Sequence, residues 1–338
     1  MTETEKKNRA VEAAREKTSR TKEAAGETEA SRTEVPAGRS RCGLVLEGGG
    51  MRGIYTAGVL DVFLEQGISF DGVIGVSAGA IHGASFVSGQ RGRSIRYYKK
   101  YCRDRRFISV RNLLLTGDMV GHRFCYYDLP ERLDPYDYEA FNRSGTEFYV
   151  TCSNLETGKA EYLRITDMKK QIELCRASAA LPYVSRIVGW KGMKLLDGGC
   201  TDSIPVRGME RLGFSRNVIV LTRPADYRKK PEASWMAPLA YHAYPNFVKA
   251  LENRHRIYNR TVEAIGRREQ AGRAFVIRPQ KELAIGRTEG DPGKLQRVYE
   301  TGRRDAEESL AALSEWLSRP GNGGLSDAEN HIDLSNNL

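Results

Sequence analysis

The chain has 338 residues, of which 40% are hydrophobic and 28% charged, and its net charge is +10. This length suits one large α/β domain or two average domains, and the apolar content excludes a chain that is disordered throughout. No apolar stretch approaches the roughly 18 residues of a membrane-spanning helix, and no signal-peptide core precedes the body. We therefore expect a cytoplasmic protein with reduced cysteines, whose basic body favours anionic partners.

Composition divides the chain into four parts. Residues 1–39 are charged and almost free of large apolar side chains, which predicts a disordered tail. Residues 40–223 alternate strand and helix patterns and are expected to form the main domain. Residues 224–317 are expected to add an α/β extension, largely helical, that packs on this domain. The Gly- and Asn-rich residues 318–338 predict a second loose tail.

The first predicted elements alternate between strands and helices. An apolar run at 43–47 predicts a strand, and the glycines after it predict a turn into a helix over 54–64. Residues 70–76 predict a second strand that leads directly into a small-residue helix at 77–88. This alternation is typical of the α/β class, with a parallel sheet covered by helices. Further strands are predicted at 147–153, 160–165, 194–197, 217–222 and 274–278, and further helices at 91–106, 254–273 and 292–317.

The first of three short motifs is a glycine-rich loop after the first strand, Gly48-Gly49-Gly50-Met51-Arg52-Gly53. It satisfies the G-x-G-x-x-G pattern of dinucleotide-binding proteins, but that pattern requires an acidic residue at the end of the next strand. Here Asp71 precedes that strand instead. Backbone N–H groups at such a turn also suit an oxyanion of acyl transfer, so we assign the loop to a candidate oxyanion hole.

The other two motifs supply a hydroxyl and a carboxylate. Gly75-Val76-Ser77-Ala78-Gly79 is a G-x-S-x-G placed where the second strand meets its helix, the context of a nucleophile elbow. Small residues on both sides allow a strained turn that exposes the Ser77 hydroxyl, and the helix N-terminus favours negative charge there. Asp197-Gly198-Gly199 places a carboxylate on a tight turn at a strand end.

These three segments, in this order, resemble the patatin-like phospholipase family, whose pattern is G-G-G-x-[RK]-G, then G-x-S-x-G, then D-G-[GA]. Residues 176–182 resemble the family's A-S-x-A-x-P segment. Residues 202–206 resemble its D-N-x-P-V segment, with Ser203 where Asn is common. The resemblance covers residues 42–223. Glu47 is a departure, because the family often has Asp or Ser there.

The resemblance implies a three-layer α/β/α sandwich with a mostly parallel central sheet. It also implies a serine acyl hydrolase of lipid esters, of phospholipase A or lysophospholipase type, that works through an acyl-enzyme. Ser77 would be the nucleophile and Asp197 the proton acceptor, in a dyad without histidine. No cofactor is implied, and no His, Cys or acidic spacing suggests a metal site. An acyltransferase with the same site, and a catalytically weak module that binds lipid headgroups, are the alternatives.

Partners follow from the charge pattern. The expected substrate is a lipid ester, and no motif indicates nucleic-acid binding. Residues 91–106 carry eight basic side chains on a predicted helix, and residues 228–230 form a basic loop. Each cation near an anionic surface contributes about 1 kcal/mol, so these segments are candidate contacts of a peripheral protein with an anionic membrane. The alternative is an ordinary solvated helix face. His82, on the helix after Ser77, is expected to pack inside the protein.

Overall fold

The structure is a computed structural model that describes residues 40–232, 235–286 and 288–319. The predicted tail at 1–39 and most of the one at 318–338 lie outside these residues. Within them, eight strands form one sheet in the order β5-β6-β3-β2-β1-β7-β8, and β4 pairs with β3. The strands are β1 (Cys42–Leu46), β2 (Gly72–Val76), β3 (Glu147–Asn154), β4 (Ala160–Ile165), β5 (Val188–Trp190), β6 (Met193–Asp197), β7 (Arg216–Val220) and β8 (Ala274–Ile277).

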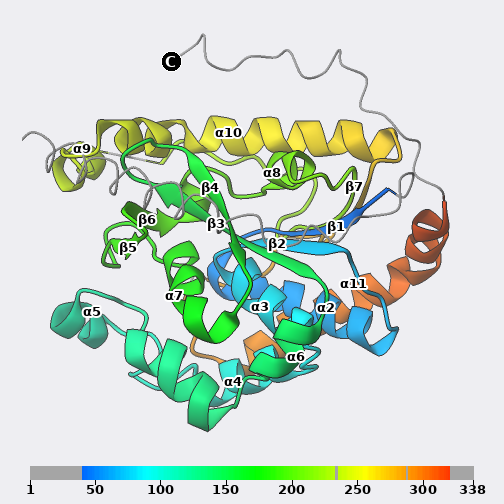
Figure 1. Ribbon diagram of the computed structural model, residues 1–338, viewed down its shortest axis with the longest axis horizontal. Coiled ribbons are helices and arrows are strands. Elements are labelled where there is room, and N and C mark those ends of the chain that lie inside the picture. Colours follow the sequence, from blue (N-terminus) through cyan, green and yellow to red (C-terminus); the bar gives the residue numbers. More distant parts are fainter. Residues whose placement is uncertain (1–39, 233–234, 287, 320–338) are drawn as a thin grey trace, which may run out of the picture. The chain divides into compact units, whose positions relative to one another are not determined.

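Helices cover both faces of this sheet (Figure 1). The helices are α2 (Ile54–Glu65), α3 (Ala78–Val87), α4 (Arg93–Tyr101), α5 (Val110–Thr116), α6 (Tyr138–Arg143), α7 (Met168–Ser178), α8 (Val206–Arg211), α9 (Met236–Ala240), α10 (Pro245–Gln270) and α11 (Pro292–Ser318). The short helices η1 (Gly50–Gly53) and η3 (Gly198–Cys200) and the π-helix η2 (Phe124–Leu133) complete the described elements. All six cysteines are free thiols, as expected.

The middle of the sheet is parallel and one end is antiparallel. β3, β2, β1, β7 and β8 are parallel to one another. β4 and β6 are each antiparallel to β3, and β5 is antiparallel to β6. In a parallel sheet the carboxyl ends of neighbouring strands meet at one edge, where ligands bind. The predicted mostly parallel α/β sheet is confirmed.

Alternating side chains of the central strands enter two separate cores. Leu44 and Leu46 of β1 pack in the larger core with α2 and α3, while Val45 packs in the smaller core with Ile219 of β7 and Ile265 of α10. Figure 1 shows α2, α3, α7 and α11 on one side of the sheet and α8 and α10 on the other. Because side chains along a strand point to opposite faces in turn, this pattern produces the three layers that the resemblance implied.

The C-terminal helix α11 packs closely on α2. Tyr55 of α2 donates to Asp305 of α11 at 2.9 Å, and Tyr299 of α11 donates to Asp61 of α2 at 2.7 Å. Burial raises the pKa of both Asp61 and Asp305. Strand β8 joins the sheet beside β7, so the C-terminal region contributes both a strand and two long helices to the same unit. The boundary at residue 223 stays a prediction.

Candidate active site

Ser77 occupies the strained turn that the G-x-S-x-G motif predicts. It directly follows β2 and caps the N-terminus of α3, with φ of 54° and ψ of −121°, a conformation that is costly for a residue with a side chain. Its backbone N–H donates to Ser178 Oγ at 3.0 Å, and that hydroxyl donates to the carbonyl of Thr151 in β3 at 2.7 Å. The neighbouring strand and α7 therefore hold the turn in place.

The two glycines of this motif are required by close backbone approach. A Cβ atom on Gly75 would lie 2.5 Å from the backbone of Ala80, and one on Gly79 would lie 2.6 Å from the carbonyl oxygen of Leu46. Contacts this short with backbone atoms cannot be relieved by a side-chain rotation. Backbone packing thus fixes how β2 turns into α3, and with it the position of Ser77.

Asp197 ends β6 on a turn that is held by three hydrogen bonds. Its N–H donates to Ala180 O at 2.8 Å, its carbonyl accepts from Ser153 Oγ at 2.7 Å, and its Oδ1 accepts from the N–H of Gly199 at 2.7 Å. The side chain is buried. In the sheet, β3 lies between β2 and β6, with Thr151 opposite Val76 and Cys152 opposite Asp197.

The glycine-rich loop connects β1 to α2, as predicted. Gly50 has φ of 55°, in the left-handed region that favours glycine. The N–H of Gly48 donates to Ser203 O at 3.4 Å, and the N–H of Arg52 donates to Gly49 O at 3.2 Å. Helix η1 begins at Gly50 and continues into α2, and the first N–H groups of a helix have no intrahelical acceptor.

Two cavities meet at Ser77. The polar cavity brings together seven predicted site residues, Gly48, Gly49, Gly50, Arg52, Ser77, Asp197 and Gly199. Nine further residues complete its wall, and most of them come from outside the three motifs: Glu47, Leu181, Ser203, Arg223, Tyr227, Lys229, Glu232, Arg254 and Tyr258. The nucleophile candidate and the base candidate therefore share one cavity. We call Arg223, Lys229 and Arg254 its cationic wall; Arg223 pairs with Glu282, and the other two pair with Glu232.

The second cavity at Ser77 is mainly apolar. Gly50, Ser77 and Leu181 line both cavities. The rest of the apolar wall is mainly aromatic and aliphatic and includes Met51, Ile81, Tyr97, Tyr98, Phe107, Ile108, Met119, Val120, Tyr126, Leu129 and Val184. The other predicted residues, Gly53, Gly75, Gly79 and Gly198, line neither cavity. Gly53 packs against Ala78 and His82 instead of facing the site.

Glu47, the departure from the family pattern, holds the glycine-rich loop. One carboxylate oxygen accepts from the N–H and hydroxyl of Thr222, at 2.5 and 3.0 Å, and the other accepts from Tyr258 Oη at 2.8 Å. Glu47 is buried, and burial raises the pKa of Tyr258, so its hydroxyl keeps the proton that it donates. We name these contacts the Glu47 clamp. The sequence contains no pattern that predicts the contact between Glu47 and Tyr258, which are 211 positions apart.

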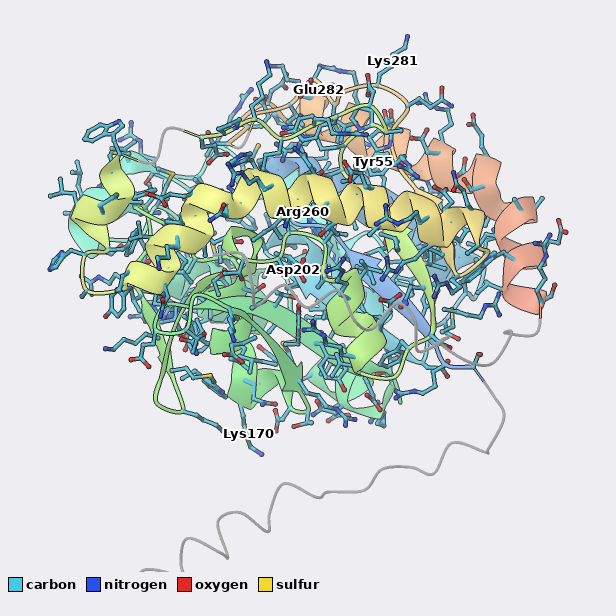
Figure 2. The ribbon with its side chains drawn as sticks, turned by 90° about the horizontal axis from the view of Figure 1, so that it is seen from above. Tyr55, Lys170, Asp202, Arg260, Lys281 and Glu282 are labelled. Atoms are coloured by element: carbon cyan, nitrogen blue, oxygen red, sulfur yellow. The ribbon has the colours of Figure 1, made fainter. Side chains whose placement is uncertain are left out.

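No histidine among the described residues lines either cavity. His82 is buried, bonds Ser94 Oγ at 2.9 Å and has its pKa lowered to about 3 by burial, which confirms its expected packing role. Asp202, the carboxylate nearest to Asp197 in sequence, accepts from Tyr162 Oη at 2.8 Å and lines neither cavity. Figure 2 labels Asp202 in the view from above, together with Arg260 of α10. The carboxylates that share the polar cavity with Ser77 are thus Asp197, Glu47 and Glu232. Glu47 is held in its clamp and Glu232 pairs with Lys229 and Arg254, which leaves Asp197 as the base candidate.

The basic segments find partners inside the protein. Arg96 binds Asp134 through two hydrogen bonds of 2.7 and 2.8 Å, Lys99 donates to Gln296 at 2.8 Å, and Arg103 donates to Gly290 O at 3.0 Å. In the loop at 228–230, the central lysine bonds α10 through its backbone and lines the polar cavity. Membrane contact through 91–106 and 228–230 remains a prediction, and these contacts weaken it.

Comparison with known families identifies the domain that carries this site. A family model of patatin-like phospholipases matches residues 44–209. This chain carries a patatin-like phospholipase domain. Ser77 and Asp197 both lie within it. A second family model, a domain of unknown function (DUF6363), matches residues 244–318, which include α10 and α11. Tyr258 and Arg254, which reach the polar cavity, therefore belong to the second matched region.

Relatives of this chain include bacterial and fungal proteins. The uncharacterized protein YjjU of Escherichia coli (strain K12) is 27% identical over 288 residues, which cover 82% of this chain and 79% of YjjU. Lysophospholipase NTE1 of Kluyveromyces lactis is 27% identical over 323 residues, 88% of this chain and 21% of NTE1. The chain thus spans about a fifth of the length of such fungal relatives.

Among solved structures, VipD from Legionella pneumophila is similar with a TM-score of 0.43 and 15% identity, over 83% of this chain and 69% of that chain. The domain match and the lysophospholipase relatives together support lipid hydrolysis in general. None of the helices in the described ranges combines the length and apolar character that crossing a membrane requires.

Proposed function

We propose that this protein is a serine acyl hydrolase of lipid esters, of phospholipase A or lysophospholipase type, with Ser77 as nucleophile and Asp197 as proton acceptor. The observation that carries the proposal is that the strained Ser77 turn and the buried Asp197 line one cavity together with the glycine-rich loop. This combination supplies the nucleophile, base and backbone donors that acyl transfer requires.

The two cavities suggest how an amphipathic ester would lie. The acyl chain would occupy the apolar cavity and the headgroup the polar one, so that the ester carbonyl sits at Ser77, where the cavities meet. Arg223, Lys229 and Arg254 in the polar wall suit a phosphate-bearing headgroup. Hydrophobic walls with a few placed polar groups are the usual design of sites for such ligands.

The proposed reaction has two steps. Asp197 takes the Ser77 proton while Oγ attacks the ester carbonyl, and N–H groups of the loop from Gly49 to Met51 stabilise the oxyanion. The alcohol of the headgroup leaves with that proton, and the acyl group stays on Ser77. Water then attacks the acyl-enzyme and gives a proton to Asp197. The fatty acid leaves and Ser77 Oγ regains the proton.

Two substitutions test the dyad. Ser77→Ala and Asp197→Asn should each lower ester hydrolysis at least ~100-fold without unfolding, because nucleophile and base act as a unit. A fluorophosphonate probe should label the wild type and not Ser77→Ala. Comparing a lysophospholipid with a monoacylglycerol of the same chain length reports on the cationic wall, which should favour the lysophospholipid.

The matched control is Asp202→Asn, the same change in a half-buried carboxylate that lines neither cavity. It should retain hydrolysis if it folds, which circular dichroism and a melting curve would establish. Full activity in a folded Asp197→Asn protein would contradict the dyad and point to Glu47 or Glu232, the other carboxylates that line the polar cavity.

A further inference from the structure

The exposed apolar side chains of the protein gather in a few segments. Among the described residues, five large apolar side chains are more than three-fifths exposed, and all belong to α5 or to the start and body of α9. Leu114 is 81% exposed, Leu239 75% and Trp235 73%. Tyr183 and Ile187, beside β5, are also exposed. Large exposed apolar patches on a folded protein mark interaction sites.

Hydrogen bonds join these segments into one surface. The N–H of Met119, just past α5, donates to Val184 O at 2.8 Å, and the N–H of Arg186 donates to Asp118 Oδ1 at 2.8 Å. The N–H of Tyr183 donates in turn to the hydroxyl of Tyr241, the residue that caps α9, at 2.9 Å. Figure 1 places α5, β5 and α9 at the same end of the sheet. We call residues 107–117, 181–192 and 235–243 the docking face.

The docking face adjoins the candidate site. Phe107 and Ile108 from its first segment, and Leu181 and Val184 from its second, line the apolar cavity that reaches Ser77. An apolar surface that is continuous with an apolar cavity suits a partner that itself supplies acyl chains. We therefore favour a lipid layer, and not a folded protein, as the partner of this face.

Charge identifies the kind of lipid layer. The docking face contains three cations, Arg111, Arg186 and Lys191, and no aspartate or glutamate. All three are exposed, and none forms an ion pair with another described residue. A surface that combines exposed Leu and Trp with unopposed cations matches the interface of an anionic bilayer. By contrast, the basic helix α4 directs Arg93 and Arg96 onto Asp134.

We propose that the docking face is the surface through which this protein binds an anionic phospholipid bilayer. The proposal deepens and rests on the proposed function, since the bilayer would present the lipid ester beside the apolar cavity. Leu114, Leu115, Trp235 and Leu239 enter the interface, and Arg111, Arg186 and Lys191 meet lipid phosphates. The acyl chain of a bound lipid then has a path along apolar side chains to Ser77.

Binding is measured by co-sedimentation of the full chain carrying Ser77→Ala, which leaves the vesicles chemically intact. The vesicles contain equal parts of phosphatidylglycerol and phosphatidylcholine. Adding Leu114→Ser and Leu239→Ser should weaken partitioning at least ~10-fold, because both side chains lose apolar burial in the interface. The matched control is Leu133→Ser with Ile257→Ser, which alters two less exposed apolar residues outside the docking face and should not change partitioning.

A second pair of variants separates the docking face from the basic helix. Arg111→Glu with Lys191→Glu should weaken binding to these vesicles at least ~10-fold, and binding to pure phosphatidylcholine should change little. Lys99→Glu with Lys100→Glu makes the same change in net charge on α4 and should have a much smaller effect. Equal effects of the two pairs would show that net charge, not the docking face, controls binding.

Fluorescence of Trp235 gives an independent signal. It is the exposed one of the three tryptophans, since Trp316 is buried and Trp190 is partly so. Vesicles should shift its emission to the blue, and Trp235→Phe should remove most of the shift, leaving the contribution of the partly exposed Trp190. Absence of vesicle binding by the parent, or unchanged binding by the Leu114 and Leu239 variant, overturns the proposal. So does a variant that only dissociates a dimer, which would make this face a contact between copies.

Failure of the docking face and failure of the hydrolase remain distinguishable. On the Ser77 background, the Leu114 and Leu239 variant should hydrolyse a soluble short-chain ester at the parental rate and a vesicular substrate at least ~10-fold more slowly. If the parent binds vesicles through this face but hydrolyses neither substrate, the docking proposal stands and the hydrolase proposal fails.

Discussion

The Ser77 turn and the Glu47 clamp border the same cavity, yet different kinds of contact hold them. The turn depends on backbone approach at Gly75 and Gly79 and is built entirely within residues 44–209. The clamp depends on side chains, and Tyr258 reaches it from the second matched region. The comparison teaches that the Ser77 turn is determined locally, whereas the loop that would hold the oxyanion is positioned by distant parts of the chain.

The largest effect is expected from a substitution that disrupts the backbone packing of the Ser77 turn. In Gly79→Ala the new Cβ would lie 2.6 Å from Leu46 O and 2.7 Å from Glu47 O, so the turn must move. We expect ester hydrolysis to fall at least ~100-fold, and the free energy of unfolding to fall by about 1–3 kcal/mol. Activity assays and urea denaturation measure the two effects.

The control for this substitution is Gly266→Ala on α10. A Cβ there meets no atom within 4 Å, so activity should not change, and stability should stay equal or rise by up to about 1 kcal/mol. Retention of full activity by Gly79→Ala would mean that the turn does not need this packing.

Tyr258→Phe tests the Glu47 clamp, because it removes the hydrogen bond to Glu47 and little else. Loss of a bond to a buried carboxylate should lower the free energy of unfolding by about 1.5–3 kcal/mol. Hydrolysis should also fall roughly 10-fold, because the loop is no longer fixed against Ser77. Tyr149→Phe removes a similar 2.7 Å bond to Glu147 outside both cavities. If both variants lose equal activity, the clamp has no particular role at the site.

The smallest effect concerns His82, which packs behind the turn. Burial lowers its pKa to about 3 from an ordinary 6.5, so between these pH values the unfolded chain binds a proton that the folded chain excludes. Stability should therefore fall with falling pH, by up to about 1.4 kcal/mol per pH unit from this group. His82→Gln should flatten that slope, with the partly exposed His122→Gln as control. Loss of hydrolysis at neutral pH in a folded His82→Gln protein would make histidine part of the chemistry.

Sequence patterns predicted the parts of the fold that are locally determined. The alternation of apolar residues located β1, β2, β3, β4 and β7 to within about two residues, and Asp291 does cap α11 by accepting from the N–H of Gly293. Short elements without strong periodicity were not predicted, among them α5, β5, α9 and the π-helix η2. Their positions depend on tertiary packing, which local propensity does not encode.

The same limit applies to the candidate site. The three motifs located Ser77, Asp197 and most of the loop, because each motif imposes its own backbone geometry. The wall contributed by Arg223, Lys229 and Arg254 could not be found in this way, since ordinary arginines and lysines abound in a basic chain. Only the fold brings them beside Ser77.

The Glu47–Tyr258 bond also has a consequence for how the protein matures. Its two ends are 211 positions apart, and the Tyr55–Asp305 bond spans 250 positions, so these bonds cannot form before residues 258 and 305 have been synthesised. Contacts of such long sequence separation form late because a large loop must close first. A nascent chain that already contains the Ser77 turn therefore lacks the clamp beside it. We therefore expect the glycine-rich loop to be fixed beside Ser77 only late in folding.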